Sequence, residues 1–336
     1  MNIVIPMAGW GSRLRPHTLT VPKPLIKIAG KSIVHRLVEN LSKSVSEPIE
    51  EIAFIIREDF GKEIENNLLE IAKSLNTKGI IVYQDEPLGT AHAIMCAKES
   101  LRGNVIVAFA DTLFKTDFTL DTNADGVIWV SKIDDPSAFG VIKLNEQNII
   151  TDFVEKPKEF VSDLAIIGIY YFKDGAYLKD ELQYLLDNDI KDKGEYQLTN
   201  ALENMKQKGS KFVPGKVDEW LDCGNKNATV HTNSRILEHI KKDEKLVHDS
   251  VIIENSIIIQ PCYIGENTKI VNSVVGPHTS IGANTSIQDS RISNTIIQTK
   301  SIISNQVIEN SMIGSNTSIS SSAKDLSIGD YNQISI

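Results

Sequence analysis

The stretch of sequence that decides the fold is residues 2–25, which read NIVIPMAGWGSRLRPHTLTVPKPL. Its first part, 2–7, is an apolar run that predicts a buried strand. Gly9 and Gly11 follow at once, and because they lack a Cβ they let the backbone turn tightly and approach a ligand closely. Three basic side chains bring positive charge to the same loop: Arg13, Arg15 and Lys23. The stretch therefore indicates a strand that leads into a polyphosphate-binding loop.

Two common glycine-rich loops do not match these letters. The dinucleotide-binding pattern G-x-G-x-x-G requires a third glycine where Leu14 stands, and no Gly-Lys-Ser/Thr of a P-loop follows. A plain strand-to-helix turn with surface basic residues is the simplest remaining interpretation. It accounts for the two glycines, but not for Pro22, Lys23 and Pro24 in register with them.

The pattern G-x-G-S-R-L-x-P-x-T at 9–18, followed by P-K-P-L at 22–25, resembles the signature of the sugar-1-phosphate nucleotidylyltransferases, also called nucleoside-diphosphate-sugar pyrophosphorylases. Within that family the motifs are most similar to those of glucose-1-phosphate thymidylyltransferases and uridylyltransferases. The resemblance implies an α/β fold with a doubly wound mixed sheet, Rossmann-like and GT-A-like. It also implies that the loop binds the nucleotide through Ala8, Gly9, Gly11, Ser12 and Arg13.

Length and charge narrow the function classes. The chain has 336 residues, enough for two domains, and its formal net charge of -9 argues against nucleic acid as a partner. No stretch approaches the roughly 18 apolar residues that a membrane span needs, and the N-terminus has no secretory signal pattern. We therefore expect a cytoplasmic protein with no membrane partner. The three cysteines lack C-x-x-C spacing, so neither a disulfide framework nor a zinc site is indicated.

Up to about residue 235, short β-rich runs alternate with amphipathic helical stretches, which predicts a mostly parallel, doubly wound sheet. The expected strands are 2–7, 51–56, 79–83, 104–109, 126–131, 140–144 and 165–172. The expected helices are 31–43, 59–75, 88–101, 175–188 and 195–208. Ligands of such sheets bind beyond the carboxyl ends of the strands, which is where the Gly9 loop leaves the first strand.

After about residue 245 Ile, Val, Ser and Asn dominate, and Ile-Gly-x-Asn-Thr-x-Ile occurs three times, at 264, 281 and 313. Apolar residues recur between these motifs at steps of five or six: Ile264, Ile270, Val275, Ile281, Ile287, Ile292, Ile297, Ile302, Ile308, Ile313 and Ile319. The motif thus returns to the same face of a three-sided coil. The segment resembles the left-handed parallel β-helix of hexapeptide repeats, and a disordered Ser/Asn-rich tail is the alternative. We expect a catalytic domain at 1–240 and a β-helix domain at 241–336, through which the chain forms a homo-oligomer.

Residues 84–93, QDEPLGTAHA, resemble the family's nucleobase segment. Their glutamine supplies both a donor and an acceptor, which suits the carbonyl and N–H of uracil or thymine. The resemblance assigns the base site to Gln84, Pro87, Gly89 and Thr90. A plain turn around the proline and glycine is the alternative.

Three later segments resemble those that hold the sugar phosphate: AFGV at 138–141, VEKP at 154–157 and AIIGIY at 165–170. By this resemblance the sugar phosphate is bound by Gly140, Glu155, Lys156 and Gly168. Enzymes for N-acetylglucosamine 1-phosphate usually carry an asparagine just before the last glycine. Ile167 stands there, which argues against that substrate.

Two aspartates resemble the family's metal ligands, Asp111 after an apolar strand and Asp222 within WLDCGN at 220–225. The resemblance implies that they hold Mg²⁺, although an aspartate after a strand is as often a helix cap. A sugar 1-phosphate is already anionic at neutral pH, so catalysis requires positioning and charge neutralisation and no general base. The residues expected to carry it are Arg13, Lys23, Asp111, Lys156 and Asp222.

The sequence therefore predicts a Mg²⁺-dependent nucleotidylyltransferase that converts a nucleoside triphosphate and a hexose 1-phosphate into a nucleotide sugar and pyrophosphate. Glucose 1-phosphate with dTTP is the first choice, UTP follows because Gln84 does not contact the thymine methyl, and mannose 1-phosphate with GTP is third. Two other classes stay open. A β-helix acyltransferase would need a catalytic histidine such as His278, and a non-catalytic sugar-nucleotide regulatory subunit would be expected to lack Lys23 or one of the aspartates. We expect His92 and His278 to be surface or packing residues.

Overall fold

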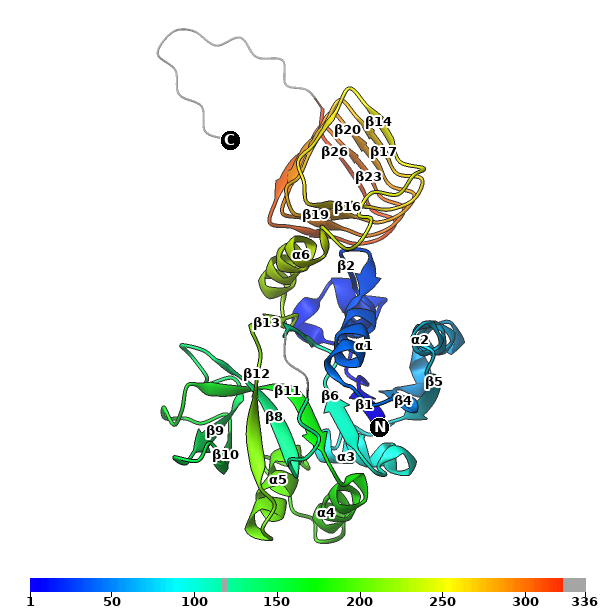
Figure 1. Cartoon of the computed structure of the whole chain (residues 1–336). Helices are drawn as coiled ribbons and strands as arrows, with labels where there is room; N and C mark the ends of the chain where they lie inside the picture. The colour runs from blue at the N-terminus through cyan, green and yellow to red at the C-terminus, as the bar shows by residue number, and fades with distance from the viewer. Residues whose placement is uncertain (117–119, 323–336) are drawn as a thin grey trace. The chain divides into compact units, whose positions relative to one another are not determined.

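The chain folds as two compact units. The structure is a computed structural model that describes residues 1–116 and 120–322 (Figure 1). Met1–Ile26 and Lys31–Ala228 form an α/β unit, whereas Lys27–Gly30 and Thr229–Ile336 form a β-helix unit. The expected domain limit at residue 240 stays a prediction, and 323–336, the end of the expected β-helix domain, lie outside the described residues.

A nine-stranded mixed sheet forms the centre of the α/β unit (Figure 1). Its strands are β1 (Asn2–Pro6), β4 (Glu51–Ile56), β5 (Lys78–Tyr83), β6 (Val105–Ala108), β8 (Gly126–Lys132), β9 (Gly140–Leu144), β10 (Ile150–Glu155), β11 (Leu164–Phe172) and β12 (Phe212–Lys216). The order is β10-β9-β11-β6-β1-β4-β5, and β8 pairs with both β11 and β12. The four strands β5, β4, β1 and β6 are parallel, whereas β11 is antiparallel to β6, β8 and β9. The mixed sheet is confirmed, and parallel order prevails only in its N-terminal half.

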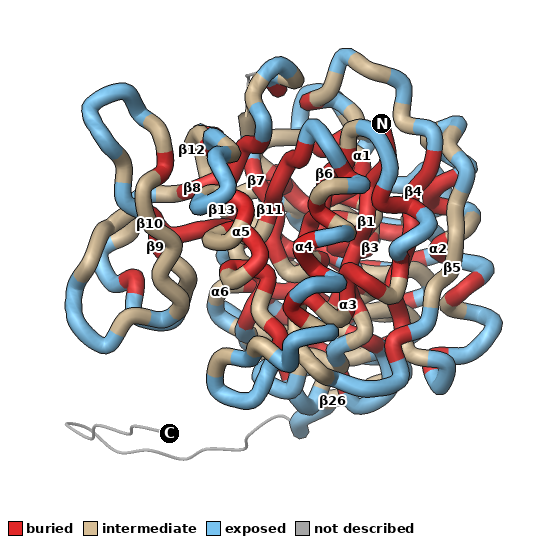
Figure 2. Tube along the Cα trace, turned by 90° about the horizontal axis from the view of Figure 1, so that it is seen from below, coloured by how far each residue is buried: buried red, intermediate tan, exposed pale blue. Residues whose placement is uncertain are grey.

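The core explains why the predicted strands form. Ile3, Val4 and Ile5 of β1 are fully buried, because a central parallel strand is covered on both faces. Figure 2 shows the buried stretches concentrated in β1, β4, β6 and β11. Two short segments elsewhere, β7 (Thr112–Lys115) and β13 (Glu219–Asp222), pair as an antiparallel ribbon.

Five helices belong to the α/β unit and match the expected positions. They are α1 (Ile33–Ser44), α2 (Lys62–Ser74), α3 (Thr90–Cys96), α4 (Gly175–Asp187) and α5 (Leu198–Gln207). The Ser32 side chain caps α1, and Asp174 caps α4 by accepting hydrogen bonds from two backbone amides. A sixth helix, α6 (Lys226–Ile240), was not expected. Among residues 1–116 and 120–322, no helix combines the length and apolarity that a bilayer crossing requires.

Three parallel sheets make up the β-helix, as predicted for a left-handed coil of hexapeptides (Figure 1). The first sheet contains β14 (Ile252–Glu254), β17 (Lys269–Val271), β20 (Ser286–Gln288), β23 (Ile302–Ser304) and β26 (Ser318–Ser320). The second contains β15 (Ile257–Ile258), β18 (Val274–Val275), β21 (Arg291–Ser293) and β24 (Val307–Glu309). The third contains β16 (Cys262–Ile264), β19 (Thr279–Ile281), β22 (Ile296–Ile297) and β25 (Met312–Ile313). Asparagines in the left-handed conformation recur at the corners between strands, where their short polar side chains tolerate positive φ.

The prediction of which residues point into the β-helix is wrong at one position. Ile303 is fully buried beneath Ile287, whereas the expected Ile302 points outward and is 57% exposed. The coil length changes at this point, since Ile270 pairs with Ile287 seventeen residues on but Ile287 pairs with Ile303 sixteen residues on. Two adjacent isoleucines make both registers apolar, and only the backbone pairing distinguishes them.

Candidate active site

The loop after β1 consists of three short 3₁₀ helices, η1 (Ser12–Leu14), η2 (His17–Leu19) and η3 (Lys23–Leu25). Gly11 begins it at φ +78°, and its carbonyl accepts a 2.9 Å hydrogen bond from the Thr18 hydroxyl. A Cβ at Gly11 would lie 2.6 Å from the Cβ of Lys23, so only glycine lets the lysine pack against the start of the loop. The loop thereby folds back so that Lys23 packs against Gly11.

The predicted metal aspartates lie on neighbouring strands. Asp111 precedes β7, Asp222 ends β13, and the amide of Cys223 donates a 2.9 Å hydrogen bond to the Asp111 carbonyl. The Lys23 ammonium lies 2.7 Å from a carboxylate oxygen of Asp111. Three segments that are distant in sequence thus contribute to one charged cluster.

Burial raises the pKa of the Asp222 carboxyl, and the negative charge of Asp111 raises it further. The Gly224 amide, which donates a 2.9 Å hydrogen bond to Asp222, lowers that pKa, as do the charges of Lys23 and Arg13. Arg13 is exposed, yet its charge acts on this carboxyl. Arg13, Lys23, Asp111 and Asp222 are therefore electrostatically coupled.

This cluster fits Mg²⁺. Two carboxylates that repel one another are stabilised by a divalent cation, and Mg²⁺ is typically held by one or two carboxylates together with substrate phosphates. Asp111 and Asp222 are the residues that would hold it, and Lys23 is the nearest cation to complete the charge balance. Among the described residues, no group of three or more His, Cys, Asp or Glu side chains is arranged as a metal site.

A pocket opens where the four parallel strands end. Its lining residues are Pro6, Ala8, Gly9, Arg57, Gln84, Asp85, Pro87, Gly89, Thr90, Ala93, Phe109 and Glu195. Four of them follow the carboxyl ends of β1, β4, β5 and β6, namely Ala8, Arg57, Gln84 and Phe109. This is the edge at which parallel α/β sheets bind ligands. The structure therefore brings six of the nine residues expected at the nucleotide into one pocket.

Gln84 is 8% exposed, and its Nε2 lies 3.3 Å from Nδ1 of His92 on α3. When the His92 ring carries its proton on Nε2, Nδ1 accepts from the Gln84 amide. The Gln84 carbonyl oxygen is then available to a ligand in the pocket. His92 was expected to be a surface or packing residue, and the sequence gave no sign of its contact with Gln84.

The turn at Gly89 is held by the start of α5. Gly89 has φ +116°, and a Cβ there would lie 2.4 Å from the Tyr196 carbonyl oxygen. The Tyr196 amide donates to the Leu88 carbonyl at 2.8 Å, and the Leu198 amide donates to the Thr90 hydroxyl at 2.9 Å. Glu195, which was not among the expected site residues, lies just before these contacts and lines the pocket.

The expected sugar-phosphate residues form a second group. Gly140 and Glu155 are direct partners in the β9–β10 ladder, and a Cβ on Gly140 would lie 3.0 Å from a Glu155 carboxylate oxygen. Lys156 follows at φ +44°, with its ammonium 3.5 Å from Glu155 and 56% of its side chain exposed. Gly168 lies in the irregular part of β11 at φ +84°.

Tyr170 connects the two groups electrostatically. Burial raises the pKa of its phenol, and the charges of Glu155 and then Asp111 raise it further. The buried ring therefore lies within the field of an acid from each group. The Gly168 carbonyl accepts a 2.9 Å hydrogen bond from the Phe109 amide, which ties β11 to the strand end that lines the pocket.

The fold and the site define a class: an α/β protein with a basic glycine loop, an acid pair and a pocket at the carboxyl edge of a parallel sheet. Residues 3–239 match the model of the nucleotidyl transferase family. The chain belongs to that family.

The chain is also similar to proteins along most of its length. It is 33% identical to the Bifunctional protein GlmU of Methanococcus aeolicus over 77% of this chain and 60% of that protein, so it spans about 60% of the length of this relative. It is 27% identical to a glucose-1-phosphate thymidylyltransferase of Streptomyces antibioticus over 90% of this chain and 88% of the relative. A solved putative glucose-1-phosphate thymidylyltransferase of Bacillus anthracis has the same fold, with a TM-score of 0.60 and 21% identity over 73% of this chain and 96% of that chain.

Proposed function

We propose that the protein transfers a nucleotidyl group from a nucleoside triphosphate to a hexose 1-phosphate, producing a nucleotide sugar and pyrophosphate. The observation that carries the proposal is the convergence of Lys23, Asp111 and Asp222 from three separate segments, coupled to one another and to the exposed Arg13. Cations and a carboxylate pair in one cluster match a reaction between two phosphoryl groups.

Repulsion is the main barrier to this reaction. The second pKa of a phosphate monoester is about 6, so the attacking oxygen is already an anion at neutral pH. It must approach the α-phosphorus of a second anion in line with the departing pyrophosphate. Lys23 and Lys156 would hold the two reacting phosphoryl groups, and Arg13 with the loop amides would bind the β- and γ-phosphates. Mg²⁺ held by Asp111 and Asp222 would supply Lewis-acid charge neutralisation when bound.

The base pocket supports a pyrimidine. With its Nε2 donating to His92, Gln84 presents a carbonyl oxygen to the pocket, and uracil and thymine carry an N3–H that donates to such an acceptor. Cytosine has an acceptor at the same ring position. Gln84 makes no distinction between uracil and thymine, because the methyl group lies on another edge of the ring.

Glucose 1-phosphate with dTTP is the pair we expect first. The Streptomyces relative, which covers 90% of this chain, bears the name glucose-1-phosphate thymidylyltransferase. The bifunctional archaeal relative is more identical over a shorter segment. Ile167 is buried in β11. Because its side chain is aliphatic, it offers no amide to an N-acetyl group, which supports a simple hexose.

A substrate matrix tests the proposal. Five triphosphates, dTTP, UTP, GTP, CTP and ATP, are each combined with the 1-phosphates of glucose, galactose, mannose, glucosamine and N-acetylglucosamine, with pyrophosphate release as the readout. We expect turnover with dTTP or UTP plus glucose 1-phosphate, and loss of at least a hundredfold in kcat for Asp111→Asn. Turnover confined to GTP with mannose 1-phosphate would replace the substrate assignment, and no release from any pair would overturn the function.

A further inference from the structure

A short hairpin connects the catalytic loop to the β-helix unit. Lys27–Gly30 begin four residues after Lys23, yet they belong to the compact unit of Thr229–Ile336, whereas the residues just before and after them belong to the α/β unit. Strands β2 (Lys27–Ile28) and β3 (Lys31–Ser32) form the hairpin. At its turn Ala29 has φ +44°, a conformation that costs energy for a residue with a Cβ and persists only where its surroundings hold it.

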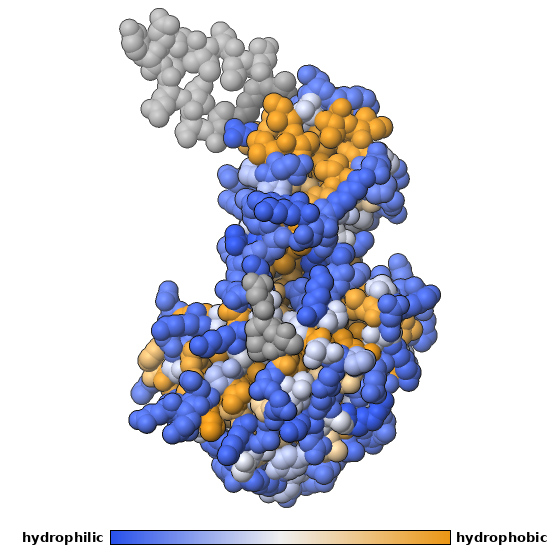
Figure 3. Space-filling model, in the orientation of Figure 1, coloured by the Kyte–Doolittle hydropathy of each residue, from blue (hydrophilic) through white to orange (hydrophobic). Residues whose placement is uncertain are grey.

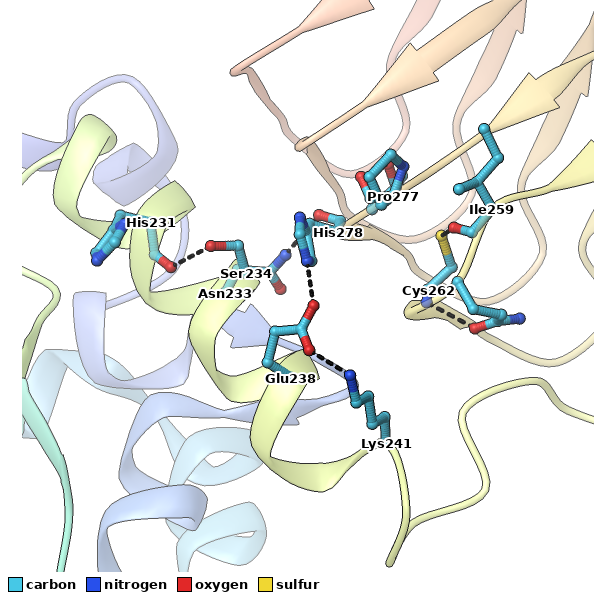
Figure 4. Close-up of polar contacts among 11 residues, drawn as sticks. His231, Asn233, Ser234, Glu238, Lys241, Ile259, Cys262, Pro277 and His278 are labelled. Atoms are coloured by element: carbon cyan, nitrogen blue, oxygen red, sulfur yellow. Dashed lines mark hydrogen bonds and ion pairs between the residues drawn. The ribbon is translucent and has the colours of Figure 1, made fainter. Parts of the chain in front are cut away.

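Asn233 on α6 is the residue that holds this turn. Its side chain is fully buried, and its Oδ1 accepts a 3.0 Å hydrogen bond from the Ala29 amide and a 2.6 Å hydrogen bond from the Ser280 hydroxyl. Its Nδ2 donates to the His278 carbonyl at 3.2 Å, as Figure 4 shows. One buried amide therefore connects Ala29 at the hairpin turn with Ser280 and His278 of the β-helix, and all four residues belong to the same unit.

Further contacts hold the same arrangement. Gln298 of the β-helix donates a 3.0 Å hydrogen bond from Nε2 to the Lys27 carbonyl. The Tyr263 ring packs so closely on Gly30 that a Cβ there would lie 2.3 Å from it. His278 Nε2 lies 2.6 Å from a Glu238 carboxylate oxygen, which ties the β-helix corner to α6 (Figure 4). His278 is thus engaged in a structural contact.

The hairpin is directly continuous with the lysine that the catalytic cluster uses. The Ile26 amide donates a 3.1 Å hydrogen bond to the Lys23 carbonyl, which closes η3, and Lys27 is the next residue. The Lys23 ammonium is in turn 2.7 Å from Asp111. Displacement of a reacting or charge-neutralising group by about 1 Å can cost a hundredfold in rate. A conformational change at 27–30 can therefore move the Lys23 backbone directly, because only three residues separate Lys23 from Lys27.

We propose that Asn233 is a positioning residue for nucleotidyl transfer: by fixing the Ala29 turn on the β-helix unit, it sets the backbone of Lys23–Ile26 and so holds the Lys23 ammonium at Asp111. This inference rests on the proposed function. It gives the β-helix a part in catalysis without a second active site, because the unit supplies the anchor for four residues of the N-terminal sequence.

A double-mutant cycle in the full-length protein tests the inference. Asn233→Ala and Gln298→Ala are each made in the wild type and in Lys23→Ala, and Thr299→Ala is the matched control because its hydroxyl contacts Ser315 and no residue of the hairpin. We expect Asn233→Ala to lower kcat at least tenfold and Gln298→Ala about threefold, with KM for the sugar phosphate within about threefold of wild type. In Lys23→Ala neither should lower kcat further, since the group that they position is absent. Thr299→Ala should match wild type.

Hydrogen exchange on peptides covering 22–30 provides a readout that does not depend on the substrates. Asn233→Ala should speed exchange in this segment while leaving β5 and α2 unchanged. If Asn233→Ala fails to fold, Gln298→Ala is compared in the same two backgrounds, and we expect a smaller loss of kcat and a smaller change in exchange. Equal fold-losses in the two backgrounds, or unchanged exchange at 22–30, would overturn the positioning role. A wild type that releases no pyrophosphate with any substrate pair would instead reject the proposed function, and the exchange result would still stand.

Discussion

The Nε2 atom of Gln84 lies 3.3 Å from Nδ1 of His92, and when the His92 proton is on Nε2 this contact directs the Gln84 carbonyl oxygen toward the pocket that Gln84 lines. Gln84 is nearly buried, so a rotated amide would leave its Nε2 without this acceptor and would carry a desolvation cost. We therefore expect His92 to act on base choice through Gln84 and not by touching the base.

Replacing His92 should weaken the preference for bases that carry N3–H. In His92→Phe the Gln84 amide is free to rotate, and we expect kcat/KM for UTP and dTTP to fall about fivefold, the effect of one ordinary hydrogen bond. The value for CTP should stay unchanged or rise. His92→Asn is the matched control, because its side-chain oxygen can take the place of Nδ1 and restore the preference. Equal losses for all triphosphates in both variants would contradict the positioning of Gln84.

Asp222 should reduce stability when no metal is present. Its raised pKa means that the folded state binds the proton more tightly than the unfolded state, so its favourable contribution exists at low pH and is lost as pH rises through the raised pKa. Asp222→Asn should therefore have a higher Tm than wild type in EDTA at pH 7–8, and an equal Tm near pH 3, while losing at least a hundredfold in kcat. Melting curves from pH 3 to 8 give the comparison. A Tm difference that does not vary with pH would show that the charge of Asp222 is not the cause.

Addition of Mg²⁺ extends this test. The ion should raise the Tm of wild type more than that of Asp222→Asn, because binding to the native state stabilises by mass action. A shift of equal size in both proteins would place the ion elsewhere.

Lys156 should act mainly on the second substrate. Its side chain is more than half exposed and its ammonium is 3.5 Å from Glu155, so it is available to a phosphate. We expect Lys156→Ala to raise KM for the sugar phosphate about tenfold or more, as loss of a charge-assisted hydrogen bond does, while KM for the triphosphate stays within about twofold. Lys158→Ala, two residues on and also exposed, is the control. An effect confined to the triphosphate would contradict the assignment.

The sequence predicts local features well where a period or a motif determines them. The apolar run of β1, the alternation of helices and strands and the five- and six-residue steps of the β-helix all reflect burial on one or two faces. A tight backbone turn was expected at Gly11, and its φ of +78° agrees with this expectation. The acid pair and the base segment were found by motif, and the structure brings each set together.

Other features depend on contacts between distant segments. Strand β12 contains Pro214 and Gly215, which disfavour a strand in isolation, and it forms by pairing with β8. The buried face of α6 includes Thr229, Thr232 and Asn233, so its hydrophobic period is weak and the helix escaped detection. The membership of 27–30 in the β-helix unit has no local signal, because it results from Asn233 and Gln298, more than 200 residues away.

The outer surface of the β-helix bears apolar side chains that should mediate self-association. Ile257 and Val307 are 62% and 83% exposed and lie at the two ends of one outward row of the second sheet, with Val274 and Arg291 between them. Figure 3 shows an apolar area on this unit. Exposed apolar patches of this kind usually mark an interface. We therefore expect the wild type to be a homo-oligomer through this face.

Introducing negative charges on this face should dissociate the oligomer without disturbing the fold of the β-helix. Ile257→Glu with Val307→Glu should lower the mass measured by light scattering, and Ser318→Glu, on an exposed position of another sheet, should not. A deletion after residue 240 is a poorer probe, because together with the surface it removes Gln298, which donates to the Lys27 carbonyl, and Ser280, which donates to Asn233. Since the double variant leaves Asn233, Lys23 and the acid pair intact, its kcat should stay within about tenfold of wild type. An unchanged mass, or a wild type that is already monomeric, would contradict the expected role of this face.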